Sequence, residues 1–102
     1  MVELDLARPG WKKQAILALQ GRDPVAVRAE GRKAVLLRQY LQMMSSMGDR
    51  EAEPGALAFL RVVLPLRGFH SVYARASALG RRVILAESDP EAVVVVFERP
   101  VR

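Results

Sequence analysis

The stretch VAVRAEGRKAVLLRQYLQMMSSM, residues 25–47, decides the fold of this chain. Val25–Glu30 is typical of a strand, and Gly31 separates it from Arg32–Met47, where apolar residues recur at helical spacing. These apolar residues cover about half of the helix circumference, more than the stripe of roughly 100° that a helix needs to cover one sheet. Gly48 follows as a natural helix end. A strand followed directly by an amphipathic helix indicates a fold in which helices pack on a sheet.

Further elements are predicted on both sides of this stretch. Val2–Leu6 alternates apolar and polar residues as a half-buried strand does, and Trp11–Gln20 suits a short helix. Toward the C-terminus, Arg81–Ala86 and Ala92–Arg99 predict two strands joined by a turn at Ser88–Glu91. The last two strands are therefore expected to form a hairpin.

The composition is that of a globular domain. The chain has 102 residues, of which 51% are hydrophobic and 26% are charged, and this is enough apolar material to bury a core. We expect one α+β domain over residues 1–102: a two-layer sandwich with a mixed or antiparallel sheet, two main helices and a C-terminal antiparallel hairpin. No apolar run approaches the ~20 residues that span a bilayer, so a cytoplasmic location without membrane contact is expected. The absence of Asn and Cys also fits a thermophilic source, and the alternative is the compositional bias of a GC-rich genome.

Two segments in the middle of the chain are ambiguous. Leu57–Leu66 begins with residues that favour a helix and ends with residues that favour a strand, and Pro65 limits both; we predict an extended segment. His70–Ala78 alternates like a strand, yet Ser71 could cap a short helix that ends at Gly80. Both alternatives stay open for this second segment.

Four consecutive valines, Val93–Val96, place apolar side chains on both faces of the last strand. This pattern indicates that the sheet is covered on both sides at that point. Because a domain of this size rarely supplies two covering layers, we expect a homo-oligomer, most simply a two-fold dimer. The alternative is that residues 57–79 supply the second layer.

Catalytic and metal-binding constellations are scarce. The chain has no cysteine and a single histidine, His70, which has no nucleophile motif around it and is expected to be structural. Acidic residues gather at Asp49–Glu53 and Glu87–Glu91, but neither cluster has the spacing of a calcium-binding loop. The isolated glycines match no phosphate-binding loop. We therefore expect no enzyme, no metal site and no cofactor.

Basic residues outnumber acidic ones by 16 to 11, which gives a formal net charge of +5. Gly31 lies between a strand and the start of a helix, and the basic residues after it oppose the helix dipole, which indicates an anionic partner nearby; ordinary solvated charge is the alternative. A tryptophan beside two lysines could stack on a base, or it could pack against the core. The predicted nucleic-acid contacts are Trp11, Lys12, Lys13, Arg28, Arg32 and Lys33.

The order strand, helix, strand, helix and then further strands resembles that of Alba-like nucleic-acid-binding domains. The stretch VRAEGRKAV, residues 27–35, is similar to the basic strand-to-helix turn of that group. The resemblance covers less than a fifth of the chain, and the residues after Gly48 are too many for the single hairpin that such domains carry. It implies a related arrangement of elements and assigns no residue roles.

These observations favour a non-catalytic module that binds RNA or DNA through phosphate contacts. The alternative is a homo-oligomeric structural or regulatory domain whose partner is another protein. In that case the methionine side of the central helix is the adaptable surface. The two readings differ in whether the basic residues form one exposed patch or are scattered and ion-paired. The methionines predicted at the oligomer interface are Met43, Met44 and Met47.

Overall fold

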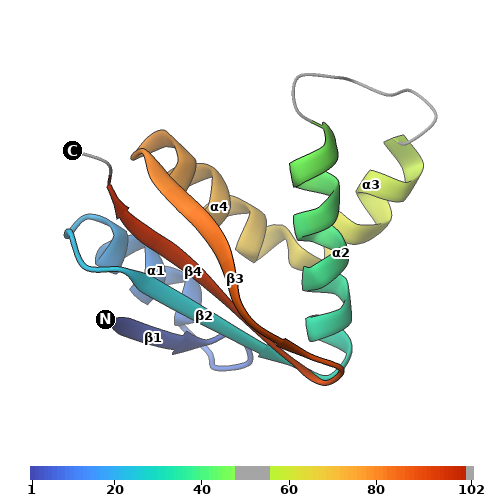
Figure 1. The fold of residues 1–102 in the computed structure, drawn as a ribbon, viewed down its shortest axis with the longest axis horizontal. Coiled ribbons are helices and arrows are strands. Elements are labelled where there is room, and N and C mark those ends of the chain that lie inside the picture. Colours follow the sequence, from blue (N-terminus) through green and yellow to red (C-terminus); the bar gives the residue numbers. More distant parts are fainter. Residues whose placement is uncertain (48–55, 101–102) are drawn as a thin grey trace.

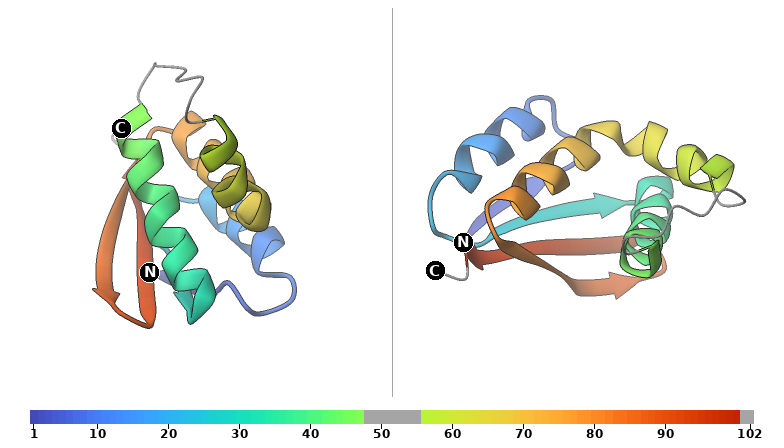
Figure 2. Two further views of the ribbon diagram at one scale, coloured as in Figure 1. Left: turned by 90° about the vertical axis from the view of Figure 1, so that its right-hand side faces the viewer. Right: turned by 90° about the horizontal axis from the view of Figure 1, so that it is seen from above.

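The protein consists of two layers, a four-stranded sheet and a set of helices that lie on one of its faces (Figure 1, Figure 2). The structure is a computed structural model and describes residues 1–47 and 56–100. α1 and α4 run alongside the strands, whereas α2 runs across them at one end of the sheet (Figure 1). The elements are β1 (Val2–Asp5), α1 (Trp11–Leu19), β2 (Val25–Glu30), α2 (Arg32–Met47), α3 (Ala56–Val63), the 3₁₀ turn η2 (Leu64–Leu66), α4 (Arg67–Ala78), β3 (Arg81–Asp89) and β4 (Ala92–Pro100).

The sheet is mixed, with the strand order β1-β2-β4-β3. β1 and β2 are parallel, and β4 is antiparallel to both of its neighbours, β2 and β3. The predicted α+β class, with a C-terminal antiparallel hairpin, is confirmed. The order of elements in the Alba-like resemblance is present too, with α3, η2 and α4 inserted before β3. Because β1 and β2 are parallel, α1 and α2 both begin at the same end of the sheet.

Alternate residues of the central strands build the core. Val25 and Val27 of β2 and Val93 and Val95 of β4 are fully buried beneath the helices. Phe69 of α4 packs among them and makes ring contacts across the layers. The helices therefore stay on the sheet because each covers apolar side chains that alternate on one face of the strands.

Two expectations for the middle of the chain are settled by the structure. The extended segment predicted at Leu57–Leu66 is wrong, because α3 and η2 occupy it. Val62 and Val63 are buried against the core from a helix, so tertiary packing outweighs their preference for strands. Of the two alternatives at His70–Ala78, the helix is correct, and α4 ends at Ala78, shortly before Gly80. The cap expected at Ser71 is wrong, because α4 already begins at Arg67 and the Ser71 hydroxyl donates to the Arg67 carbonyl within the helix. The number of helices therefore exceeds the two main ones that were predicted.

The valine run of β4 divides between the two faces of the sheet. Val93 and Val95 enter the core, whereas Val94 and Val96 lie on the face opposite the helices. α3 and α4 cover the same face as α1 and α2 (Figure 2), so residues 57–79 do not form a second covering layer. Within the described residues, no helix covers the face that carries Val94 and Val96.

Arg81, the first residue of β3, connects the sheet to the end of α1 through side-chain hydrogen bonds. Its side chain is only 4% exposed. The guanidinium donates hydrogen bonds to the carbonyls of Asp23 (2.7 Å) and Leu19 (3.1 Å) and also to that of Gly21. These carbonyls end α1 and begin the turn after it, where the helix dipole is negative and favours a cation. Burial lowers the pKa of Arg81, as does the nearby Arg22, whereas Asp23 raises it.

Candidate nucleic-acid interface

The helix layer carries charge of one sign, whereas the sheet layer carries both signs. None of the eleven Asp and Glu residues of the chain falls within the bounds of α1, α2, α3, η2 or α4. The strands and the turns between them carry Glu3, Asp5, Asp23, Glu30 and further acids toward the C-terminus. The helix layer is therefore cationic throughout, through Lys12, Lys13, Arg32, Lys33, Arg38, Arg61, Arg67 and Arg75.

α1 and α4 pack side by side (Figure 2), and each carries exposed basic side chains. The two helices are in close contact at Gly68, where an added Cβ would lie 3.6 Å from Trp11 Cζ2 and 3.9 Å from Lys12 Cδ. The aliphatic stem of Lys12 thus lies against α4 beside Arg67, and Arg75 follows two helical turns later, about 12 Å along α4. We call this region the α1–α4 basic surface, defined by Lys12, Lys13, Arg67 and Arg75; all four side chains are exposed.

The side chains of this surface make no ion pair within the described residues. The ion pairs in that part of the chain join Arg28 to Glu30 (3.0 Å) and Arg82 to Glu98 (3.4 Å), both in the sheet. Among the described residues, no carboxylate is ion-paired with these four side chains to relieve their mutual repulsion. A polyanion would relieve it.

Trp11 lies at the start of α1 but faces inward. Its ring is half-buried and lies nearly parallel to that of Phe69, with 6.5 Å between the centroids and an interplanar angle of 27°. This is the packing alternative considered for the residue, and its ring face is occupied by Phe69. None of the six aromatic side chains of the protein is exposed. The layer therefore offers charge without a stacking platform.

The other predicted contacts are divided between the layers. Arg32 and Lys33 are exposed in the first turn of α2, at the same end of the sheet as the start of α1. Arg28 lies on β2 and is ion-paired with Glu30. It shares the face of the sheet that carries Val94, away from the helices. The structure therefore groups Lys12 and Lys13 with helical arginines, places Arg32 and Lys33 at the edge of that layer, and separates Arg28 from all of them.

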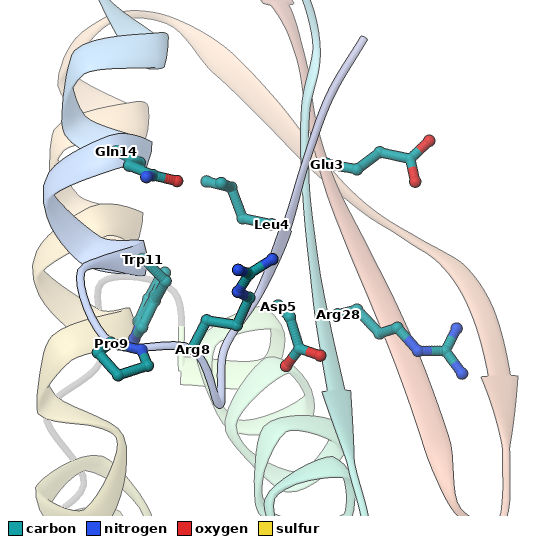
Figure 3. Close-up of a pocket in the computed structure, with 8 residues that line it drawn as sticks. All are labelled: Glu3, Leu4, Asp5, Arg8, Pro9, Trp11, Gln14 and Arg28. Carbon is teal, nitrogen blue, oxygen red and sulfur yellow. The ribbon is translucent and has the colours of Figure 1, made fainter.

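A groove of about 370 Å³ lies beside edge strand β1, at the end of the sheet where α1 begins (Figure 3). Leu4, Gln14 and Trp11 lie on its α1 side, whereas Glu3 and Arg28 point away on the other side of the strand. The Asp5 carboxylate accepts the Ala7 N–H at 2.8 Å and so belongs to the turn. The groove thus gathers no converging set of reactive groups. Arg8 also lines it and adds a positive charge just before the start of α1.

His70 has a structural partner. Its Nδ1 lies 2.7 Å from the hydroxyl of Tyr40, which is fully buried between α2 and α4. The rings of Phe69 and Tyr73 pack edge-on against Tyr40. Burial, and then the neighbouring Tyr73, raise the pKa of the Tyr40 phenol above its ordinary value. The pair satisfies a buried hydroxyl, and no serine or carboxylate joins it among the hydrogen bonds of the described residues.

Of the two acidic clusters considered as metal ligands, Asp49–Glu53 lies outside the described residues. In the second cluster, Asp89 Oδ1 accepts the backbone N–H groups of Glu91 (2.9 Å) and Ala92 (2.7 Å) and thereby holds the β3–β4 turn. Over residues 1–47 and 56–100, no group of three or more His, Asp or Glu side chains is placed to hold a metal ion.

Two further features concern partners. Met43 and Met44, predicted at an oligomer interface, are partly buried and pack against the core, and the Met47 side chain lies outside what the structure describes. Among the helices that the structure describes, none combines the length and the apolar character needed to cross a bilayer.

The sequence analysis missed the helical arginines Arg61, Arg67 and Arg75. Two of them lie in segments for which no helix was expected or settled, so their grouping with Lys12 was hidden. A signal was present nonetheless, because no Asp or Glu occurs between Glu53 and Glu87.

Comparisons with known proteins add no relative. No family model, no curated protein and no solved structure matches this chain.

Proposed function

We propose that the protein binds nucleic acid without catalysis, through phosphate contacts made by the α1–α4 basic surface. The observation that carries this proposal is the charge segregation between layers, since every charged residue on the described helices is basic. Positive side chains fixed on one rigid surface match the regularly spaced phosphates of a nucleic acid and release its counterions on binding. The element order shared with Alba-like domains agrees with this function but, as an analogy of fold, does not establish it.

The preferred substrate is a duplex, bound without regard to its sequence. Proteins that bind single strands rely on exposed aromatic side chains, each of which contributes about 1–3 kcal/mol by stacking on a base. All six aromatic residues here are at least half-buried. Phosphate contacts alone carry no base information. We place this activity in the cytoplasm, where a cysteine-free basic domain meets nucleic acid.

The test is fluorescence anisotropy with labelled mixed-sequence duplex DNA, duplex RNA and single strands across a salt series. Lys12→Glu/Arg67→Glu is expected to weaken duplex binding by at least about tenfold and to lower the salt slope by about two phosphate contacts. The matched control is Arg82→Glu/Arg99→Glu, which changes the net charge equally but lies on the sheet. It should bind nearly as the wild type does.

Equal losses in the two double variants would contradict the proposed surface, because net charge alone would then explain the binding. Heparin serves as a polyanion control. If heparin competes as well as duplex DNA at equal charge, the protein recognises negative charge and not the duplex. Absence of binding at low salt would rule the function out.

A specific observation also favours self-association, the other function predicted from the sequence. The uncovered face of the sheet has an apolar centre that includes Val94, Val96 and Ile84, and the ion pairs of Arg28 and Arg82 lie around it. An apolar centre with a polar rim is the usual anatomy of an interface. Four strands of about six residues give on the order of 400 Å² per copy, which corresponds to weak, reversible association.

Sedimentation velocity over a range of protein concentrations tests this second function. We expect a concentration-dependent dimer that Val94→Lys abolishes, because the new charge would be placed at the centre of the face. Leu17→Lys, on the exposed side of α1, is the matched control and should leave the dimer intact. A wild-type protein that stays monomeric at the highest concentration would exclude the interface.

A further inference from the structure

α3 exposes a stripe of leucines that the fold does not use. Leu57, Leu60 and Leu64 are 73%, 46% and 61% exposed. Their spacing of three and then four residues places them on one side of the helix and of the η2 turn that continues it. We call these three residues the leucine stripe. Large apolar side chains grouped in this way on a surface are characteristic of a docking site.

The opposite side of α3 already performs the structural role of the helix. Val62 and Val63 are buried, and Phe59 packs against the core and against the ring of His70. Anchoring α3 to the domain therefore does not require the leucine stripe. The helix is apolar on two sides, one turned to the core and one to solvent, and the second side is left for a partner.

The charges beside the stripe indicate the chemistry of that partner. Arg61 is exposed, and its position one residue after Leu60 and four after Leu57 puts it on the same side of α3 as the stripe. It has no ion-pair partner among the described residues, and no acid occurs on α3, η2 or α4. We propose that the leucine stripe docks an amphipathic helix of another protein, whose own apolar stripe is flanked by Asp or Glu.

The same charges argue against a second copy of this chain at the stripe. Antiparallel pairing of two α3 helices would bring Arg61 close to its symmetry mate, and neither helix carries an acid to compensate. Like charges facing each other across an interface disfavour that pairing. A partner rich in carboxylates gains at the place where a second copy would be repelled.

The experiment uses two labelled synthetic helical peptides with leucines in the same apolar positions. One peptide carries Glu at the flanking positions and the other carries Lys. The wild-type chain should bind the Glu peptide and not the Lys peptide. Leu57→Gln/Leu64→Gln should weaken that binding by at least about tenfold. The matched control, Leu17→Gln/Leu79→Gln, alters two exposed leucines outside the stripe and should bind as the wild type does.

Arg61→Glu tests the charge of the partner directly. We expect this variant to bind the Lys peptide in preference to the Glu peptide, and such a reversal cannot result from unfolding. Far-UV circular dichroism and urea midpoints establish that each variant is folded, and duplex DNA binding should persist in the leucine variant. The proposal is overturned if both peptides bind equally or neither binds. It is also overturned if the stripe substitutions abolish self-association or binding to vesicles containing phosphatidylserine, since the stripe would then serve a second copy or a membrane.

Discussion

The helix layer and the sheet of this protein bury their apolar sides against each other, but they differ in the charged residues that they carry. Every charged residue on the described helices is basic, whereas the strands pair arginines with glutamates. Folding does not require this difference, because exposed ion pairs contribute little to stability and exposed arginines cost little. The comparison therefore separates the contacts that hold the fold together from the charge that the helices expose on the surface.

The largest expected effect comes from replacing Arg81, which connects the sheet to the end of α1. Arg81 makes no ion pair among the described residues, and its guanidinium donates hydrogen bonds to the backbone carbonyls of Leu19, Gly21 and Asp23. Arg81→Met fills similar space but leaves these carbonyls without donors. We expect it to lower the free energy of unfolding by about 3 kcal/mol, measured by urea denaturation. Arg81→Lys should recover only part of this loss, because an ammonium cannot span the carbonyls as a planar fork does.

If Arg81 belonged to the nucleic-acid interface, its replacement would weaken DNA binding. At temperatures where the variant is folded, Arg81→Met should bind duplex DNA as the wild type does. A loss of binding without a loss of stability would show that the division between structural and exposed cations is wrong.

The polar link inside the helix layer should have a smaller effect. Tyr40→Phe removes the hydroxyl that lies 2.7 Å from His70 Nδ1 and should cost about 1 kcal/mol near neutral pH. Burial raises the pKa of Tyr40 in the folded chain, so the folded phenol keeps its proton where an unfolded one, with a pKa near 10, loses it. The stability of the wild type should therefore be fully present below about pH 10 and fall above it, by up to about 1.4 kcal/mol per pH unit.

The variant without this phenol lacks that alkaline loss. Urea midpoints measured from pH 7 to pH 11 should show the difference between wild type and Tyr40→Phe shrinking as the pH rises. Tyr73→Phe is the control, since Tyr73 is only partly buried. A constant difference across the whole range would show that Tyr40 does not titrate on unfolding as its burial requires.

The sequence predicts those parts of the fold that depend on local pattern. β1, β2, β4, α1 and α2 follow from alternation, helical spacing and glycine stops, and the structure confirms them to within a few residues. α3 could not be predicted in this way. Val62, Val63 and Pro65 disfavour a helix locally, and only contacts with the core, far away in sequence, make the helix the better conformation.

In the candidate site, too, the positions that depend on local sequence could be predicted, and those that depend on the whole topology could not. Lys12 and Lys13 are exposed on a helix as expected, and Arg32 and Lys33 lie in the first turn of theirs. The position of Arg28 depended on which face of the sheet the helices cover, and this is a property of the whole topology. A valine run predicts that a sheet has two apolar faces, but it does not tell which residues cover them.

The smallest predicted effect is at Lys33, where one substitution is expected to raise stability and to weaken DNA binding. Lys33 is exposed in the first turn of α2, where a positive charge opposes the helix dipole and which contains no acidic residue. Lys33→Glu should therefore raise the free energy of unfolding by about 0.5 kcal/mol and weaken duplex DNA binding several-fold. Lys33→Gln should fall between wild type and Lys33→Glu in both measurements. If the acidic variant is more stable and still binds DNA as tightly, α2 takes no part in the interface and the contacts are confined to the α1–α4 basic surface. If it is less stable, the cation serves the fold, and the separation of roles between the two layers fails at this residue.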